Sequence, residues 1–277
     1  IGGILSCNAS GQRRFKAGAA RDHFLGFSAV NGRGEIFRAG GKVVKNVTGY
    51  DLPKLFAGAY GALGIMTEVT VKTMPAPMDS ATLVVRDFSD EAALAVLRRA
   101  AASTLELSGL AHIHVSLTGG REQTLFRLEG PIAAVTDRLN RLKSLLQGAG
   151  EFESLSADAA ITLWRRVRDA EFFACDALPL WRLSVPPQQG AMVAAQTGAK
   201  KYFFDWAGGL IWLLHEDAAR VREAVQKSGG HATLFCAPEA LRRTVPVFEP
   251  QPPALAALEN RVREGFDPRR IFNPGAG

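Results

Sequence analysis

Two glycine-rich segments carry residue types that suit a ligand with phosphate groups. Residues 1–11 (IGGILSCNASG) contain glycines that permit close approach of the backbone, together with Asn8 and Ser10, which offer uncharged hydrogen-bonding groups. Residues 58–65 (GAYGALGI) have glycines at 58, 61 and 64. This second segment lies between a predicted helix and a predicted strand, so it differs from the GxGxxG fingerprint, which follows a strand and opens a helix. For each segment alone, an ordinary glycine-rich loop remains the alternative.

Positive charge is concentrated in the same part of the chain. Residues 1–78 hold ten Lys and Arg against four Asp and Glu, whereas residues 79–277 hold twenty-three of each, so the whole net charge of +6 lies in the first part. Cationic side chains beside a flexible backbone suit a bound pyrophosphate, with a solvated basic surface as the alternative. Nucleic-acid binding is disfavoured, because no recognised binding motif accompanies the charge.

Two side chains farther along the chain could act on a substrate. Arg182, on a predicted strand at 181–185, could hold a carboxylate through two parallel hydrogen bonds, or could be a surface arginine. His231 could accept a proton as a general base. His112 and His114 face the same side of a predicted strand, but no His, Asp or Glu at ligand spacing accompanies them. We therefore predict no metal site.

Cysteine usage and hydropathy indicate a cytoplasmic location. The three cysteines, Cys7, Cys175 and Cys236, are far apart and include no CxxC pair, as expected of small buried residues in a reducing compartment. The longest apolar run, from Phe203 to Leu214, is interrupted by Asp205 and falls short of the roughly 20 residues that span a bilayer. We expect membrane association, if any, only at the inner face and through partners.

The elements that must position these residues fall into three parts. In residues 1–78 the patterns predict strands at 24–30, 35–38 and 65–73, a tight turn at 31–34 (NGRG) and a helix at 52–60. In residues 79–244 the same order of elements occurs twice, with a linking helix at 157–173. The first set is a strand at 81–88, a helix at 90–102, strands at 111–117 and 124–128, a helix at 132–147 and a strand at 151–155. The second set is a strand at 181–185, a helix at 188–197, strands at 201–206 and 210–214, a helix at 217–228 and a strand at 231–235.

This order predicts an α+β fold. Two tandem ferredoxin-like β-α-β-β-α-β units would form one large antiparallel sheet flanked by helices. Residues 245–277 open with a proline-rich stretch, continue with a short helix at 254–264, and end in a Pro- and Gly-containing segment that we expect to be docked.

Longer blocks of sequence resemble a known family. Residues 1–11, residues 40–72 (GGKVVKNVTGYDLPKLFAGAYGALGIMTEVTVK) and residues 266–275 (FDPRRIFNPG) resemble the vanillyl-alcohol-oxidase-type enzymes, whose FAD-binding domain is of the PCMH type. The sequences WRLSVPP (181–187) and GGHATLF (229–235) are similar to the FAD-binding subunit family of bacterial glycolate oxidase. The resemblance implies a partial PCMH-type FAD domain at 1–78 that lacks its N-terminal half, an α+β cap domain for the substrate at 79–244, and a segment at 245–277 that returns to the FAD domain.

The resemblance also implies a cofactor site and an activity. The residues implied to bind FAD are Gly2, Gly3, Ala9, Ser10, Gly11, Gly61, Gly64, Ile65 and Asn273. The implied complex oxidises glycolate, or a related D-2-hydroxy acid, to the 2-oxo acid, with Arg182 and His231 as catalytic candidates and an iron–sulfur subunit as the electron acceptor. We expect the isolated chain to hold FAD weakly, because half of the family's cofactor contacts are missing. A non-catalytic assembly subunit that docks a catalytic flavoprotein subunit is the alternative, because the metal-binding histidines of related subunits have no match here.

Overall fold

The computed structural model describes residues 1–44, 49–148, 150–174 and 176–273, so Cys175 and Gly275 lie outside the described residues. The chain divides into two compact units. The first comprises Ile1–Gly11, Ala17–Pro75 and Pro250–Gly277, and the second comprises Gln12–Lys16 and Ala76–Glu249. The sequence-based assignment grouped residues 12–16 with the first domain, whereas their contacts are with the second unit.

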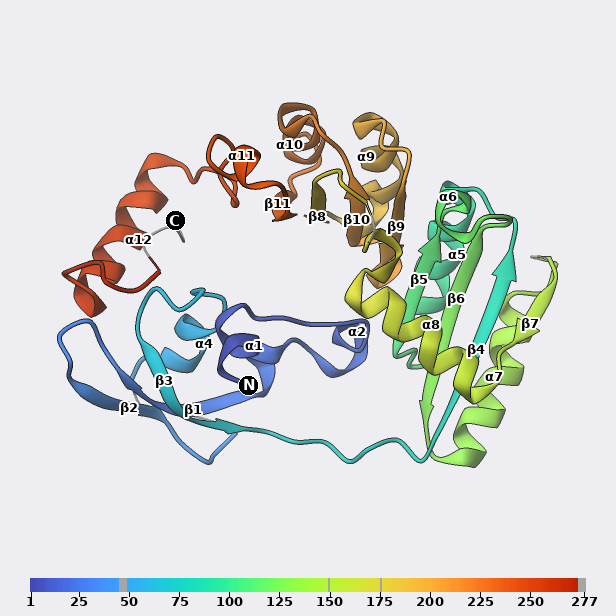
Figure 1. Cartoon of the computed structure of the whole chain (residues 1–277). Coiled ribbons are helices and arrows are strands. Elements are labelled where there is room, and N and C mark those ends of the chain that lie inside the picture. The colour runs from blue at the N-terminus through green and yellow to red at the C-terminus, as the bar shows by residue number, and fades with distance from the viewer. Residues whose placement is uncertain (45–48, 149, 175, 274–277) are drawn as a thin grey trace. The chain divides into compact units, whose positions relative to one another are not determined.

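The first unit is built on a three-stranded antiparallel sheet in the order β2-β1-β3 (Figure 1). Its elements are α1 (Gly2–Ser6), α3 (Ala20–His23), β1 (Phe24–Val30), β2 (Ile36–Gly40), α4 (Leu52–Phe56), β3 (Ile65–Val71) and α12 (Pro253–Phe266). The predicted hairpin is confirmed. In its turn, Asn31 Oδ1 accepts hydrogen bonds from the backbone N–H groups of Arg33 (2.9 Å) and Glu35 (3.0 Å), and Gly34 has a φ of +81°.

Aromatic rings join the C-terminal helix to this sheet. The ring centroids of Phe27 and Phe56 are 4.5 Å apart, and Phe266 of α12 lies 5.4 Å from Phe56. The backbone N–H of Gly32 donates to Phe266 O at 2.8 Å. A Cβ at position 32 would lie 2.2 Å from Oδ1 of the buried Asp267, so the hairpin turn and the end of α12 fit only with glycine here.

The second unit contains one eight-stranded sheet in the order β11-β8-β10-β9-β5-β6-β4-β7, with every neighbouring pair antiparallel. Its strands are β4 (Asp79–Arg86), β5 (Gly109–Ile113), β6 (Gln123–Gly130), β7 (Phe152–Ser154), β8 (Leu180–Ser184), β9 (Tyr202–Asp205), β10 (Leu210–Leu214) and β11 (His231–Cys236). Its longer helices are α5 (Asp90–Ala101), α7 (Ile132–Leu145), α8 (Ala157–Asp169), α9 (Gly190–Thr197) and α10 (Ala218–Gln226). The short α-helices are α2 (Arg14–Ala17), α6 (Val115–Thr118) and α11 (Glu239–Arg242), and the 3₁₀ helices are η1 (Glu171–Phe173), η2 (Pro187–Gln189) and η3 (Trp206–Gly208). Helix α2 ends where the chain returns to the first unit.

The predicted tandem arrangement is confirmed. Strands β4 to β7 have the spatial order β7-β4-β6-β5, and strands β8 to β11 have the equivalent order β11-β8-β10-β9. The two ferredoxin-like units meet edge to edge through β5 and β9, where His112 pairs with Phe204 and Ile113 with Phe203. A short antiparallel contact thus turns two four-stranded sheets into one.

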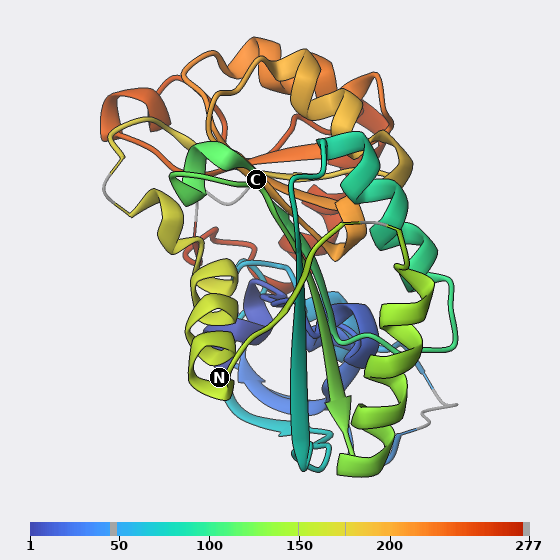
Figure 2. The same cartoon turned by 90° about the vertical axis from the view of Figure 1, so that its right-hand side faces the viewer.

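The two faces of the large sheet are covered differently (Figure 2). Buried apolar residues of α5, α7, α9 and α10 form one core with side chains from one face. On the other face, Trp164 and Val167 of α8 pack against β4, β5, β6 and β10. Strands β8 and β11 contribute Trp181, Leu183, Ala232 and Leu234 to the first core, so their alternate, more polar side chains lie on the α8 side.

One local prediction is wrong. The predicted strand at 111–117 ends at Ile113, because His114 caps the short helix α6 by accepting the Ser116 N–H at Nδ1 (3.3 Å) and Gly119 ends it with a φ of +72°. Residues 2–6, for which the sequence predicted no element, form α1. Within the parts of the chain that the structure describes, no helix has the length and apolar character needed to cross a membrane.

Candidate functional site

The three segments predicted to bind the cofactor meet at Tyr60 in the first unit. The backbone N–H of Tyr60 donates to Ser6 O at 2.9 Å, which ties the glycine turn to the end of α1. The side-chain amide of Asn273 donates to Tyr60 O at 2.7 Å, which brings the C-terminal segment to the same place. Tyr60 itself has a φ of +51°, a conformation that non-glycine residues rarely adopt. Residues far apart in sequence therefore converge on one strained turn.

The glycines of this region divide into two kinds. A Cβ built at Gly2, Gly3 or Gly61 would have no other atom within 4 Å, so the backbone there borders open space. Gly64 differs, because a Cβ would lie 2.8 Å from Val30 O of β1 and its φ is +159°. The absence of a side chain at Gly64 is thus required by packing within the chain, whereas Gly2, Gly3 and Gly61 leave room for a ligand.

The polar residues of the first segment form hydrogen bonds within its loop and with the start of α3. Ser10 Oγ donates to Asn8 O and accepts the Ala20 N–H, both at 3.3 Å, and Asn8 Oδ1 accepts the Arg21 N–H at 3.0 Å. Ala9 and Ile65 are exposed, and Gly11 is partly buried where the chain leaves the first unit. The region fits a cofactor bound mainly through backbone groups, since its side chains are small or already hydrogen-bonded.

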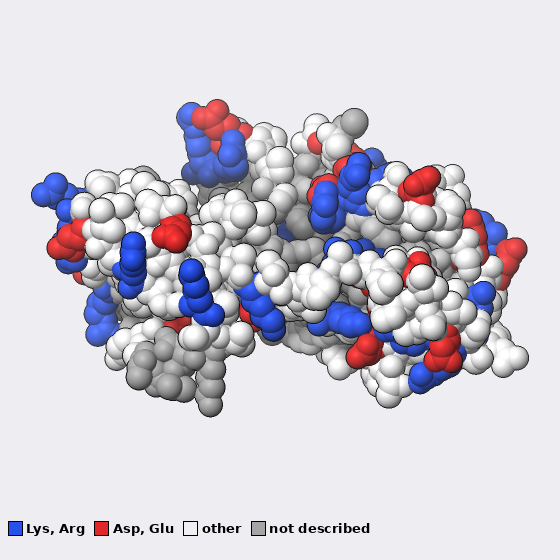
Figure 3. All heavy atoms as spheres, turned by 90° about the horizontal axis from the view of Figure 1, so that it is seen from below, with Lys and Arg blue, Asp and Glu red and all other residues white. Residues whose placement is uncertain are grey.

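The excess positive charge is spread over the surface. Arg21, Arg33, Arg38, Lys42 and Lys72 are all exposed. On the face drawn in Figure 3, Lys and Arg side chains are scattered among uncharged residues, and some of them lie next to Asp or Glu. This distribution favours the solvated basic surface over a concentrated phosphate-binding cluster.

Arg182 and His231 lie on neighbouring strands of the second unit. In the pairing of β8 with β11, His231 is opposite Ser184 and Thr233 is opposite Arg182, so the two candidates are diagonal neighbours on one face. Desolvation of the imidazole, helped by the positive charge of Arg182, lowers the pKa of His231 below its ordinary value of 6.5. His231 is therefore a neutral base at pH 7, beside a cation.

Asp205 and Trp206, which sequence reasoning missed, lie next to Arg182. The guanidinium carbon of Arg182 is 5.3 Å from the centroid of the Trp206 ring. Trp206 and Ala207 have φ values of +53° and +56°, and Asp205 Oδ1 accepts the Trp206 N–H at 2.7 Å. Burial raises the pKa of Asp205 to about 7, although its hydrogen bond from Trp206 and the charges of Arg127 and Arg182 act in the opposite direction. The sequence carries no signal for this conformation, because neither Trp nor Ala favours a positive φ.

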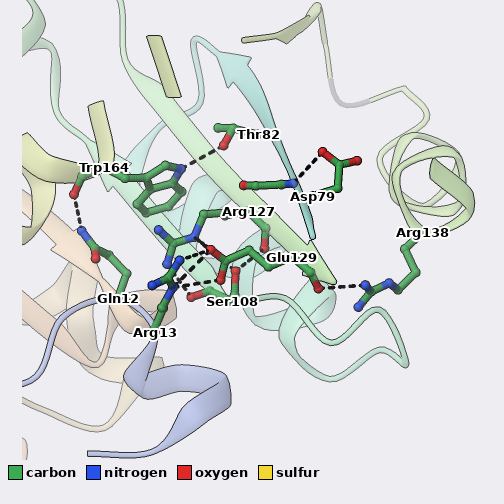
Figure 4. A network of polar contacts seen from close by, with 10 residues as sticks. Gln12, Arg13, Asp79, Thr82, Ser108, Arg127, Glu129, Arg138 and Trp164 are labelled. Carbon is green, nitrogen blue, oxygen red and sulfur yellow. Dashed lines mark hydrogen bonds and ion pairs between the residues drawn. The ribbon is translucent and has the colours of Figure 1, made fainter. Parts of the chain in front are cut away.

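A segment that we call the docking segment, residues Gln12–Lys16, is held on the second unit (Figure 4). Gln12 Nε2 donates to Trp164 O at 2.6 Å, and Arg13 binds both carboxylate oxygens of Glu129 at distances of 2.6 to 3.1 Å. Behind Glu129, Arg127 donates to Ser108 Oγ (3.1 Å) and Ser108 O (3.0 Å). Although burial opposes it, hydrogen bonding from Arg13 and the charge of Arg127 hold the pKa of Glu129 below its ordinary value.

His112 and His114 lie where the two ferredoxin-like units meet. His112 is fully buried, with Nδ1 2.9 Å from Thr124 Oγ1 and Nε2 3.2 Å from Asp90 Oδ1. Tyr202 of β9 donates to Asp90 Oδ2 at 2.7 Å, and His114 stacks on Tyr202 with ring centroids 4.4 Å apart. Across the residues with described positions, no group of three His, Cys, Asp or Glu could hold a metal ion.

Comparisons with known proteins agree with the fold and with FAD as the cofactor. No protein-family model matches the chain. The structure is similar to that of alkyldihydroxyacetonephosphate synthase, with a TM-score of 0.66 and 14% identity over 99% of this chain and 57% of that one. An FAD-linked oxidoreductase of Mycobacterium tuberculosis is 44% identical over 90 residues, which cover 32% of this chain and 19% of that protein. Glycolate oxidase subunit GlcE of Escherichia coli K12 is 31% identical over 280 residues, covering 99% of this chain and 70% of the relative.

Fold and sequence together define the class as FAD-linked oxidoreductases, and FAD is the cofactor of this wider group. Within it, the chain belongs to the family of glycolate oxidase subunit GlcE.

Proposed function

We propose that the chain is the FAD-binding subunit of a glycolate oxidase or dehydrogenase complex. In this proposal the complex oxidises glycolate, or a related D-2-hydroxy acid, to the 2-oxo acid and passes the electrons to an iron–sulfur subunit. Support comes from the GlcE relationship and, above all, from the placement of Arg182 and His231 as diagonal neighbours on one face of the sheet.

The first unit would hold the cofactor. Gly2, Gly3 and Gly61 leave open space beside the backbone, and Asn273 joins the C-terminal segment to the same turn. Backbone N–H groups in such a glycine-rich surface can bind phosphate oxygens and the edges of a flat ring. When bound, FAD supplies the acceptor for the hydride that leaves the substrate.

The second unit would hold the substrate. The guanidinium of Arg182 binds the carboxylate through two parallel hydrogen bonds and so fixes the orientation of C2. Oxidation then breaks the C2–H and O–H bonds: two electrons leave with the hydride, the proton passes to the imidazole of His231, and a C=O bond forms. Because the pKa of His231 is lowered, the base is ready at neutral pH, and we expect kcat/KM to fall with acid only below pH 6.5.

Kinetics of the assembled complex test the substrate site. Arg182→Ala should raise KM for glycolate roughly 10- to 150-fold, as expected for the loss of a charged hydrogen-bonding partner, and Arg182→Lys should recover part of the loss. His231→Ala should lower kcat roughly 10²- to 10⁴-fold and remove the acid limb of the pH profile. Arg243→Ala is the matched control, because Arg243 is exposed and forms a surface ion pair with Glu239, four residues earlier.

Flavin content tests the cofactor site. Gly3→Leu should lower the FAD content of the purified complex, since the new side chain would fill the open space beside α1. Gly265→Leu is the control in the same unit, because position 265 also has no atom within 4 Å of a built Cβ. Equal flavin content in both variants would contradict this placement of FAD.

A non-catalytic assembly subunit is the second candidate. It is favoured by the observation that the side chains of Asn8 and Ser10 already form hydrogen bonds with the backbone of their own loop and of α3. Unchanged turnover of the Arg182→Ala and His231→Ala complexes, with flavin content intact, would support this role and overturn the catalytic one.

A further inference from the structure

We propose that Ser184 and Thr233 are two further substrate-binding residues, whose hydroxyl groups bind the C2 oxygen and the carboxylate of a 2-hydroxy acid. The inference rests on the proposed function, which places the carboxylate at Arg182 and the base at His231. It follows from the register of β8 and β11, which puts all four side chains on one face of the sheet.

Strand pairing fixes the arrangement of these four residues. In the antiparallel pairing of β8 with β11, Ser184 lies directly opposite His231, and Thr233 lies directly opposite Arg182. The irregularity in β11 begins only after Leu234, so this part of the register is undisturbed. Directly opposite side chains have Cβ atoms about 5 Å apart, and alternate residues of one strand are about 7 Å apart. The four side chains therefore stand at the corners of a rectangle that one small hydroxy acid can cover.

The apolar residues of the same two strands fill the other face of the sheet. Trp181, Leu183, Ala232 and Leu234 alternate with the four polar residues and belong to the core formed with α5, α7, α9 and α10. On the opposite face, the apolar cluster beneath α8 includes Leu180 of β8 and, among the described residues, none of β11. The polar residues of β8 and β11 accordingly lie beyond the part of the sheet that α8 covers.

The hydroxyl groups of Ser184 and Thr233 are available to a ligand. Both residues are partly buried, and within the described part of the chain neither hydroxyl forms a hydrogen bond with another residue. On the part of the same face that α8 covers, by contrast, Thr82 Oγ1 accepts the Trp164 Nε1–H at 3.0 Å. A partly buried hydroxyl without a protein partner binds water or a ligand.

The position of Thr233 suits the carboxylate of the substrate. The two oxygens of a carboxylate offer about four acceptor positions, and the fork of one guanidinium occupies two of them. Because Thr233 stands directly opposite Arg182, its Oγ1–H can donate to an oxygen that the guanidinium already holds. A hydroxyl at this position adds a hydrogen bond to a charged acceptor without adding charge to the site.

The position of Ser184 suits the oxygen on C2. Ser184 stands opposite His231, which receives the proton of the C2 hydroxyl in the proposed reaction. The C2 oxygen keeps a lone pair throughout this transfer, and the Ser184 Oγ–H can donate to it. A site that forms a hydrogen bond with a substrate oxygen discriminates against the analogue that lacks this oxygen. Ser184 thus distinguishes a 2-hydroxy acid from the corresponding unsubstituted acid.

Equilibrium binding to the assembled complex tests the inference without turnover. The probes are radiolabelled glycolate and radiolabelled acetate, which differ by the C2 hydroxyl. They are dialysed against the fully reduced complex in the absence of oxygen, so that glycolate is not oxidised. Ser184→Ala should weaken glycolate roughly 3- to 10-fold and change acetate less than about twofold. Thr233→Val, which keeps the shape of the side chain, should weaken both probes roughly tenfold, because the lost hydrogen bond has a charged acceptor.

Matched variants test whether the hydroxyl groups themselves are responsible. Ser144→Ala and Thr136→Val remove exposed hydroxyl groups of α7, which donate to Asn140 O and Ile132 O, and they should change neither affinity. Thr233→Ser retains the hydroxyl and should bind both probes as the parent does. Binding by Thr233→Ser as weak as that of the valine variant would show that the hydroxyl is not the cause.

Arg182→Ala separates a failure of the inference from a failure of the proposed function. If this variant weakens both probes, unchanged glycolate binding in Ser184→Ala or in Thr233→Val overturns the role of that residue and leaves the proposed function standing. An equal loss of glycolate and acetate in Ser184→Ala likewise overturns its assignment to the C2 oxygen. Unchanged binding of both probes in Arg182→Ala overturns the proposed carboxylate site itself.

Discussion

Replacing Asp205 with asparagine should stabilise the second unit at alkaline pH and have little effect in acid. Asp205 is 2% exposed, and burial raises its pKa from an ordinary value of 3.8 to about 7. Between these two pH values the folded chain binds a proton that the unfolded chain has released. Stability therefore falls as pH rises through this window and stays low above it.

The pKa difference sets the size of the effect. One pKa unit corresponds to about 1.4 kcal/mol, so ionisation of Asp205 at pH 8 costs the folded state up to about 4 kcal/mol. An asparagine side chain cannot ionise, yet it keeps an acceptor oxygen for the Trp206 N–H. Asp205→Asn should thus be more stable than the parent by as much as this amount at pH 8, and nearly equal to it at pH 4.

Urea unfolding followed by tryptophan fluorescence is the appropriate assay. All four tryptophans, at positions 164, 181, 206 and 212, lie in the second unit, so the signal reports on that unit. Asp158→Asn, which alters an exposed carboxylate in the first turn of α8, is the matched control and should not change how stability depends on pH. If Asp205→Asn were no more stable than the parent at pH 8, the argument that burial outweighs the charges of Arg127 and Arg182 would be refuted.

Three further substitutions test other contacts. Glu129→Ala should lower the free energy of unfolding of the second unit by about 2–3 kcal/mol at pH 7, because it leaves the buried Arg127 without its carboxylate partner. Since the pKa of Glu129 is lowered, this loss should shrink as pH falls below 4.5. An equal loss at pH 3.5 and pH 7 would count against the pairing. Gly32→Ala would place a Cβ 2.2 Å from Asp267 Oδ1, so amide exchange in α12 should become faster, and unchanged protection would show that the turn can adapt. Ser89→Ala removes the N-cap of α5, whose Oγ accepts the Ala92 N–H at 3.4 Å, and should cost about 1 kcal/mol in the fluorescence assay; no loss would mean that water replaces the cap.

Local sequence patterns were sufficient for most of the scaffold. The NGRG turn was predictable because Asn accepts hydrogen bonds from its own turn and Gly adopts a positive φ without strain. The two β-α-β-β-α-β sets were predictable because alternation and helical spacing report which side of each element is buried. The strand expected at 111–117 failed because the side chain of His114 starts α6, a local hydrogen bond that competes with strand pairing.

The sequence by itself also indicated the family and the glycine-rich segments that we predict to bind its cofactor. Only the tertiary structure decided which residues meet: Asn273 at Tyr60, β5 at β9, and both Arg14 and Arg182 at Trp206. Such long-range contacts depend on how whole elements pack, and no spacing along the chain encodes them. The two glycine-rich segments are accordingly joined by the hydrogen bond from the Tyr60 N–H to Ser6 O, whereas Gln12–Lys16, which sequence reasoning had grouped with the first domain, belongs to the second unit.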